Sequence, residues 1–383
     1  MKVVRGIAVD NGGSEVRVSS LDKPELKDII KIPNDFMTIK EKDFRVKEVA
    51  EPKKLCRVIK APDERFLGIY AQGITGRAFA NQAIPISSQD DGKTTSLNYY
   101  RQLVFAVAQD AIRAWVNDGG YSLYTNSQGE KMSLNIGDGY KYCLVVCVPI
   151  KEFSGAKDCG TILRNAIAGE YEVEFPLLDN SPVVKFELSA NLTGVVPEGG
   201  IAIRALKNEI GEDEYTLVID MGHVTVDIAI FQGIHLLGQV VSSHFAGSAL
   251  IASVSAVLAD EGYFLSEAQV QEVLKTKQVK DGKSYVDVSE IVDTQIENFV
   301  NNYLRNDITR VLNANGLNVK QVQNVAPLGE PMNDPQHNYL LAKIIETMRL
   351  EKAEVKILAE DLRYVNIQQA LKFVNKLISK ARV

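Results

Sequence analysis

The sequence is poor in residues that form disulfides or bind transition metals. It contains four cysteines and four histidines among 383 residues. Cys143 and Cys147 lie in one apolar run that predicts a buried strand, and no second pair of ligands stands at the spacing that a zinc site needs. The histidines are scattered, with no pair at the helical spacing of metal ligands. We therefore interpret the cysteines as thiols of the buried core.

Long hydrophobic runs and an excess of basic charge are missing as well. No stretch approaches the roughly 20 apolar residues that span a bilayer, and the N-terminal residues do not show the pattern of a signal peptide. The net charge of −6 argues against a surface dedicated to nucleic acid or anionic lipid. We expect a cytoplasmic protein that makes no direct contact with membranes or nucleic acid.

The sequence does have the composition of an ordinary globular protein. Hydrophobic residues make up 45% of the chain and charged residues 24%, and 383 residues suffice for two domains that each bury a core. Apolar periodicity predicts both helices and strands. The expected helices include 98–117, 161–167, 201–210, 249–259, 291–314, 340–348 and 366–381, and the expected strands include 142–149 and 236–241.

Two segments far apart in the chain repeat one pattern, at residues 5–18 and 217–231. In each, a β-branched apolar run ends in Asp-x-Gly, turns and resumes as a strand, with Asp10 before the first turn and Asp220 before the second. Glycine lets the N–H groups of a turn approach an anion, and an aspartate at a strand end suits hydrated Mg²⁺. One such hairpin is common turn chemistry. Two of them predict a clamp for a metal-bound nucleotide.

Small residues open the predicted helix that follows the second hairpin. Gly247 and Ser248 stand at its start, where a helix has N–H groups without partners inside the helix. We expect these N–H groups to face outward, toward an anion or toward a neighbouring domain.

The order of hairpin, helix, strand, hairpin, small-residue helix and late glycine turn resembles the actin-type ATPase fold of actins, DnaK-type chaperones and sugar kinases. Within that superfamily the chain is similar to bacterial plasmid-segregating actins of the ParM type. The similarity covers most of the chain in short segments that occur in the right order: Ile32-Pro33-Asn34, Val148-Pro149-Ile150, Val196-Pro197-Glu198-Gly199 and Asp361-Leu362-Arg363-Tyr364-Val365-Asn366.

The resemblance implies an α/β chain with two related domains, each built on a mixed central sheet, and a nucleotide in the cleft between them. We expect domain I at 1–205 plus 360–383 and domain II at 206–359. Small inserted subdomains are expected at about 21–97 and about 260–290, where the chain is charge-rich or of mixed character.

The resemblance also implies roles for particular residues. Asp10 and Asp220 would hold the hydrated Mg²⁺, with Asp220 and Glu198 as the catalytic pair, and Glu198 would orient the attacking water. Glu198 can equally be a carboxylate that favours the helix start after it. The implied nucleotide-binding residues are Asp10, Asn11, Gly12, Gly13, Ser14, Arg17, Gly222, His223, Val224, Thr225, Gly247, Ser248 and Gly329.

The chain departs from the family pattern at two of these places. The second turn has one glycine, followed by His223 and Val224 before Thr225, where the family has two or three glycines. For His223 we favour packing or hydrogen bonding over phosphate contact. The late segment has Gly329 alone between two prolines instead of a run of glycines, so the choice between ATP and GTP stays open.

The function implied by the resemblance is that of a filament-forming actin. Such a protein hydrolyses ATP or GTP with Mg²⁺ to drive polymer dynamics, with copies of itself and a DNA-bound adaptor protein as partners, for plasmid segregation. Two alternatives remain. A small-molecule kinase would use the same clamp, and a cell-shape actin would form a structural polymer.

Overall fold

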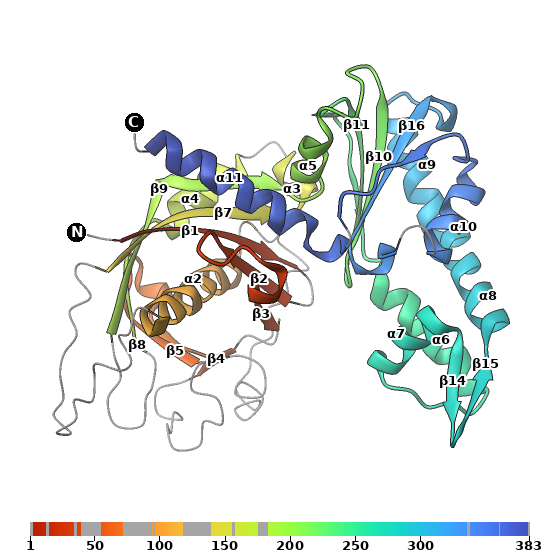
Figure 1. Cartoon of the computed structure of the whole chain (residues 1–383), viewed down its shortest axis with the longest axis horizontal. Helices are drawn as coiled ribbons and strands as arrows, with labels where there is room; N and C mark the ends of the chain where they lie inside the picture. Colours follow the sequence, from red (N-terminus) through yellow and green to blue (C-terminus); the bar gives the residue numbers. More distant parts are fainter. Residues whose placement is uncertain are drawn as a thin grey trace. The chain divides into compact units, whose positions relative to one another are not determined.

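The computed structural model describes residues 3–12, 15–33, 37–39, 55–71, 94, 96–117, 139–154, 158–174, 183–334, 338–359 and 361–381. The chain divides into unit 1, Met1–Pro197 with Asn366–Val383, and unit 2, Glu198–Val365 (Figure 1). The sequence placed these boundaries at 205/206 and 359/360. Most of the insertion predicted at 21–97 lies outside the described residues.

Unit 1 is built on a mixed sheet with the strand order β3-β2-β1-β7-β9-β8-β5-β6-β4. β7 lies between β1 and β9 and pairs with both in parallel, whereas the other pairings are antiparallel. Its apolar run is continuous because both faces of the strand are covered. The strands are β1 (Val3–Asn11), β2 (Glu15–Ser20), β3 (Ile30–Pro33), β4 (Met37–Ile39), β5 (Leu55–Lys60), β6 (Gly68–Ala71), β7 (Tyr140–Val148), β8 (Gly169–Glu174) and β9 (Val183–Pro197).

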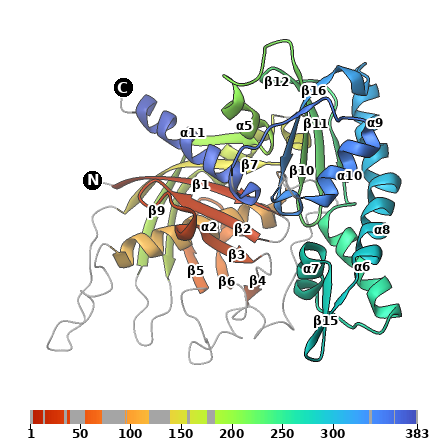
Figure 2. The same ribbon diagram turned by 45° about the vertical axis from the view of Figure 1, so that its right-hand side comes forward.

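Helices cover both faces of this sheet. α2 (Leu97–Asn117) lies against one face, and α11 (Val365–Ala381) crosses the other, as Figures 1 and 2 both show. Successive side chains of a strand point to opposite faces. Gly6 of β1 therefore faces Val374 and Ile378 of α11, and Asn11 faces α2. The short helices α3 (Ile150–Phe153) and α4 (Cys159–Ile167) follow β7.

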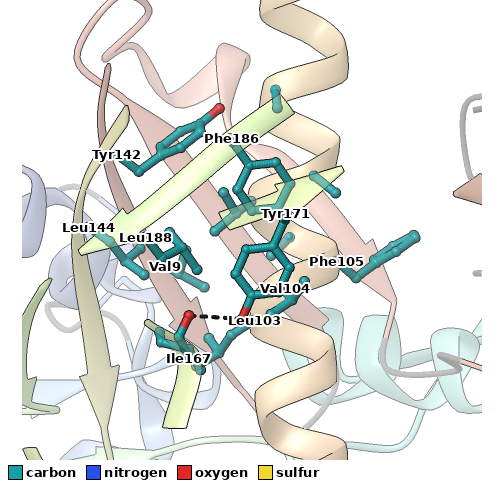
Figure 3. Packing of buried hydrophobic residues seen from close by; sticks show 14 of the residues in the cluster. Val9, Leu103, Val104, Phe105, Tyr142, Leu144, Ile167, Tyr171, Phe186 and Leu188 are labelled. Atoms are coloured by element: carbon teal, nitrogen blue, oxygen red, sulfur yellow. Dashed lines mark hydrogen bonds between the residues drawn. The ribbon is translucent and has the colours of Figure 1, made fainter. Parts of the chain in front are cut away.

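Aromatic residues fill the core between the sheet and α2 (Figure 3). Tyr171 of β8 stacks on Phe186 of β9 with ring centroids 5.0 Å apart, and its hydroxyl donates to the carbonyl of Ile167 at 2.8 Å. Tyr142 meets Phe186 edge to face. A buried hydroxyl with a carbonyl partner avoids the cost of an unmet hydrogen bond.

Unit 2 is built on a second mixed sheet of strand order β12-β11-β10-β16-β17, to which β13 adds beside β11. β10 pairs antiparallel with β11 and parallel with β16. Its strands are β10 (Tyr215–Met221), β11 (Val226–Gln232), β12 (His235–Leu236), β13 (Val241–Ser243), β16 (Val322–Leu328) and β17 (Glu354–Val355). Its helices are α5 (Gly200–Ile203), α6 (Gly247–Asp260), α7 (Glu267–Thr276), α8 (Ser289–Phe299), α9 (Arg305–Ala314) and α10 (Tyr339–Met348). A separate hairpin, β14 (Gln278–Asp281) with β15 (Ser284–Asp287), lies within the insertion predicted at 260–290.

The helices expected at 98–117, 249–259 and 366–381 are confirmed as α2, α6 and α11, and three other expected segments differ from the structure. The helix expected at 201–210 is only α5 followed by a 3-10 turn at Arg204–Leu206. The strand expected at 236–241 is two short strands with Gly238 between them, because an internal glycine weakens a strand. The helix expected at 291–314 is interrupted by a π-helical turn at Val300–Leu304. Among the described residues, no helix has the length and apolar character to cross a bilayer.

Candidate functional site

Unit 2 brings the ends of two parallel strands together. β10 ends at Met221 and β16 at Leu328, with Asp220 paired in register to Leu328. Parallel neighbours end at the same sheet edge, so the turn after β10 and Gly329 after β16 lie side by side. Asp220 also stands opposite Asp227 of β11, and cross-strand partners share one face of a sheet. Two carboxylates at this edge favour a nearby cation, because like charges opposite one another repel.

The turn after β10 is held in place by the start of α6. The Gly222 N–H donates to the carbonyl of Thr225 at 2.8 Å and closes the hairpin. The carbonyls of Gly222 and His223 accept from the N–H groups of Gly247 at 3.1 Å and Ser248 at 2.7 Å. The first N–H groups of α6 thus bind this turn and do not face outward, which corrects the expectation from the sequence. Helix-start donors need partners, and here two carbonyls of the turn supply them.

This anchoring decides which way the other N–H groups of the turn point. In a trans peptide the carbonyl and the next N–H point in opposite directions, and the described residues contain no cis peptide. Since the carbonyls of Gly222 and His223 point toward α6, the N–H groups of His223 and Val224 point away from it. Within the described part of the chain, no backbone or side-chain acceptor binds these two N–H groups. Two successive outward N–H groups form a concavity that suits an anion.

Gly199, the residue after Glu198, brings the backbone close to Asp220. Its φ of +69° lies in the left-handed region, and a Cβ there would come within 4.0 Å of Asp220 Oδ2 and 3.3 Å of a Val218 methyl. A glycine is favoured because the backbone passes so near the end of β10. Glu198 is half-buried and directly precedes this glycine. Both predicted catalytic residues belong to unit 2, and the residue after Glu198 lies close to the Asp220 carboxylate.

Gly329 packs directly on the backbone of β10. Its φ is +89°, and a Cβ would lie 2.7 Å from the Met221 carbonyl carbon and still closer to the oxygen, which no side chain permits. The Gly329 N–H donates to the carbonyl of Leu362 at 3.3 Å, and Asn333 Oδ1 accepts from the Leu362 N–H at 2.7 Å. The segment after β16 is thus fixed to residues 361–363.

An ion pair strengthens that attachment. Burial by itself would raise the pKa of the Asp361 carboxyl, but hydrogen bonds from Arg363 and Asn333 outweigh it and hold the pKa below its usual value. Arg363 Nη1 also lies 3.5 Å from Oε1 of Glu330, the residue after Gly329. The late glycine turn is therefore held by charged side chains as well as by backbone contacts.

Unit 1 carries the matching hairpin at the end of β1. Asp10 is buried and its Oδ2 lies 3.4 Å from Arg17 Nη1, while Arg17 Nε donates to Glu15 at 2.8 Å. Asn11, on the other face of β1, donates from Nδ2 to Gln102 Oε1 of α2 at 2.9 Å. This contact fixes the strand end to α2. Reasoning from the sequence missed Gln102, because it stands on a helix face that otherwise looks like core.

Part of the first turn cannot be compared with the prediction. Gly12 is described, with Glu15 O 3.1 Å from where its Cβ would be, but Gly13 and Ser14 lie outside the described residues. Arg17, predicted to bind nucleotide, here pairs with Asp10. Its positive charge therefore already lies next to the carboxylate that we expect to hold Mg²⁺.

A contact that the sequence did not predict joins the second turn to α7. His223 Nε2 lies 3.3 Å from Oε1 of Glu267, the first residue of α7. The Ser-x-x-Gln pattern at Ser266 and Gln269 could have predicted a helix start there, and both halves of that capping box are present. Nothing in the sequence pairs Glu267 with His223, since that contact depends on how α6 and α7 pack.

The donor set suits a hydrated cation better than a protein-coordinated one. Among the described residues, no group of three or more histidine, cysteine, aspartate and glutamate side chains could hold a metal ion. Mg²⁺ typically keeps most of its waters and is bound through one or two carboxylates. Within its own unit, each of Asp10 and Asp220 offers a carboxylate of that kind at the end of a strand.

Solved structures resemble this chain over nearly its whole length. Ta0583, an archaeal actin homologue, matches with a TM-score of 0.67 at 18% identity over 97% of this chain and 99% of that one. Bacillus thuringiensis ParM with AMPPNP matches with a TM-score of 0.60 at 12% identity over 99% and 100% of the two chains. A 15-stranded ParM filament from Clostridium botulinum matches with a TM-score of 0.57 at 12% identity over 98% and 100%.

The chain has the actin-like fold. The α/β class and the actin-like architecture expected from the sequence are thereby confirmed. Neither a protein-family model nor a curated protein sequence matches the chain. In this actin-like fold, the segments that the sequence singled out in unit 2 all meet at the carboxyl ends of β10 and β16.

Proposed function

We propose that this protein binds a nucleoside triphosphate with Mg²⁺, hydrolyses it and assembles into filaments. The observation that carries the proposal is the turn at 222–225. Its carbonyls are held by α6, two of its N–H groups point outward, and Asp220 stands at its entrance. An anion-binding turn beside a carboxylate pair is the local chemistry that a metal-bound polyphosphate requires.

The two hairpins share the binding task in this proposal. The outward N–H groups of His223 and Val224 and those of the turn after Asp10 bind phosphate oxygens. Asp10 and Asp220 would hold hydrated Mg²⁺, which when bound would neutralise phosphate charge. The similar fold of a ParM solved with AMPPNP, an ATP analogue, supports a nucleotide as the ligand. ATP and GTP remain equal candidates, and a position between the two domains stays a prediction.

Hydrolysis would depend on Glu198. Phosphoryl transfer to water needs mainly a positioned nucleophile and charge neutralisation. Glu198 directly precedes Gly199, whose backbone passes close to Asp220 at the proposed cation site. There it would accept a hydrogen bond from the attacking water and orient it toward the terminal phosphate.

Assembly is the second part of the proposal. Head-to-tail contacts between identical subunits build an open polymer when the rotation does not close a ring. The fold shared with a ParM filament structure supports self-assembly for this chain. We propose a cytoplasmic polymer that segregates plasmids and meets DNA only through an adaptor protein, in agreement with the net charge of −6.

Substitution of two aspartates, one at the end of β10 and one just before its start, tests the binding step. Asp220→Asn removes the charge at the carboxyl end of β10, whereas Asp213→Asn changes an exposed aspartate just before the strand. Titration with fluorescent ATP and GTP in Mg²⁺ should show binding to the wild type and to Asp213→Asn. We expect Asp220→Asn to bind on the order of tenfold or more weakly, as for a lost bond to a charged group.

Chelation of Mg²⁺ provides the matching control. Without the cation the three proteins should bind nucleotide equally weakly, since the aspartate acts through the metal. Equal affinities of Asp220→Asn and Asp213→Asn in Mg²⁺ would remove Asp220 from the site. Turnover that requires a sugar or another small substrate would favour the kinase instead.

A further inference from the structure

The turn at 222–225 is anchored on a second side that the proposed function does not use. α6 holds its backbone carbonyls, and α7 meets its one bulky side chain, because His223 Nε2 lies 3.3 Å from Glu267 Oε1. Both side chains are partly exposed, at 27% and 57%. The contact is thus a polar one at the surface, where such pairs contribute little to stability.

The position of Glu267 is itself fixed. It is the first residue of α7, and the capping box before it is complete, with Gln269 Oε1 accepting from the Ser266 N–H at 2.8 Å. A helix start that is capped in this way cannot shift without breaking those bonds. Glu267 therefore presents its carboxylate to His223 from a rigid element.

The contact bears on the N–H groups that face outward. His223 carries one of them, and its carbonyl accepts from Ser248. When the imidazole is also held, the residue is fixed both through its backbone and through its side chain. Little freedom is left for the peptide to rotate, so the N–H groups of His223 and Val224 stay in the orientation that an anion needs.

We propose that Glu267 is a positioning residue of the nucleotide site, which acts through His223 and couples the phosphate turn to α7. The inference rests on the proposed nucleotide binding. It means that bound phosphate stabilises the start of α7 and, by reciprocity, that movements of α7 change nucleotide affinity. α7 is followed directly in the chain by the β14–β15 hairpin.

A double-mutant cycle tests the pair. We would measure Mg²⁺-dependent nucleotide affinity for Glu267→Gln, His223→Gln and the double variant, with Glu272→Gln as the control, an exposed glutamate of the same helix. Each single variant should bind roughly two- to fivefold more weakly, as expected for a partly exposed polar contact. The double variant should be no weaker than His223→Gln alone, since both changes remove the same contact. Glu272→Gln should bind like the wild type.

Amide hydrogen exchange supplies a readout that a purely structural role would leave unchanged. Nucleotide should slow exchange at the start of α7 in the wild type and in Glu272→Gln, but not in Glu267→Gln. Weaker binding by His223→Gln with unchanged binding by Glu267→Gln would mean that the imidazole contacts phosphate itself, and would overturn the proposal. Additive effects of the two changes would overturn it too. A wild type that binds no nucleotide is a separate result, visible before any variant is made, and it defeats the proposed function and this inference together.

Discussion

Asp10 and Asp220 occupy equivalent places in the two hairpins but have different neighbours. Each stands at the carboxyl end of a strand, one position before the pairing ends. Across the ladder, Asp10 faces Arg17, whereas Asp220 faces Asp227. A carboxylate beside a guanidinium is already charge-balanced, and one opposite a second carboxylate gains more from a cation. The two aspartates are therefore not interchangeable, although the sequence motif around them is the same.

Asp10→Ala should abolish Mg²⁺-dependent nucleotide binding, because the hairpin loses the oxygen that anchors the hydrated cation. Titration with fluorescent nucleotide in magnesium buffer measures the effect. Asp22→Ala is the control, since it removes an aspartate of the same unit whose side chain is 61% exposed and pairs with Arg5. Equal affinity of the two variants would exclude Asp10 from the site.

Glu198→Gln should leave nucleotide affinity nearly unchanged and slow hydrolysis on the order of 10²-fold or more, the usual loss when a general base or water-orienting group is removed. Phosphate release and nucleotide affinity are measured on the same samples. Glu212→Gln, at an exposed position before β10, is expected to hydrolyse at the wild-type rate. If Glu198→Gln hydrolyses nucleotide at the wild-type rate, the Glu198 carboxylate serves only to stabilise the start of the helix that follows it.

At the scale of elements, the site depends on how closely β10 and the segment after β16 approach. Gly329 lies on the Met221 backbone, and the loop that follows is bound to residues 361–363. Asn338 also holds this loop in place, because its Nδ2 donates to the carbonyls of Pro331 and Asn333, both at 2.8 Å. The same asparagine caps α10 through the Leu341 N–H. One side chain thus positions both the loop and the next helix.

Gly329→Ala should destabilise unit 2 more than Gly262→Ala. Both glycines have a positive φ, +89° and +91°, but Gly329 also has a ψ of 165°, a region that residues other than glycine hardly adopt, and a Cβ at 262 would meet nothing within 4 Å. Gly262→Ala is therefore expected to cost only about 1–2 kcal/mol of backbone strain. Gly329→Ala adds the overlap with Met221 and should lower the free energy of unfolding by clearly more, as followed by urea denaturation. Equal losses would mean that the close approach of the two segments is not maintained in solution.

At the scale of the whole molecule, assembly separates the proposed filament from a kinase. Mg²⁺ with ATP or GTP should raise light scattering steeply above a critical protein concentration, since an open interface adds subunits without limit. A slowly hydrolysed analogue, or Glu198→Gln with the natural nucleotide, should give longer-lived polymer, and negative-stain microscopy shows whether it is filamentous. The kinase is favoured instead if light scattering shows no critical protein concentration and nucleotide is hydrolysed only when a small-molecule phosphoryl acceptor is supplied.

Much of the fold could be predicted from the sequence, because it depends on local patterns. The apolar runs around Asp10 and Asp220 predicted two hairpins, and both are present as β1–β2 and β10–β11. Helical periodicity located α2 and α11 to within one residue at their starts. Apolar periods of 3.6 residues in helices and 2 residues in strands can be read from the sequence, because each such element buries one face.

The amino-acid sequence was enough to predict the elements and the residues at their ends, since strand and helix patterns and Asp-x-Gly turns act over a few neighbouring residues. The contacts that those ends make depend on the folded unit. Folding turned the Gly247 and Ser248 N–H groups toward the turn at 222–225, placed Gly199 over Asp220 and brought Glu267 to His223. These contacts join residues from different elements. They depend on how the strands and helices of the whole unit pack, so no short segment of the sequence predicts them.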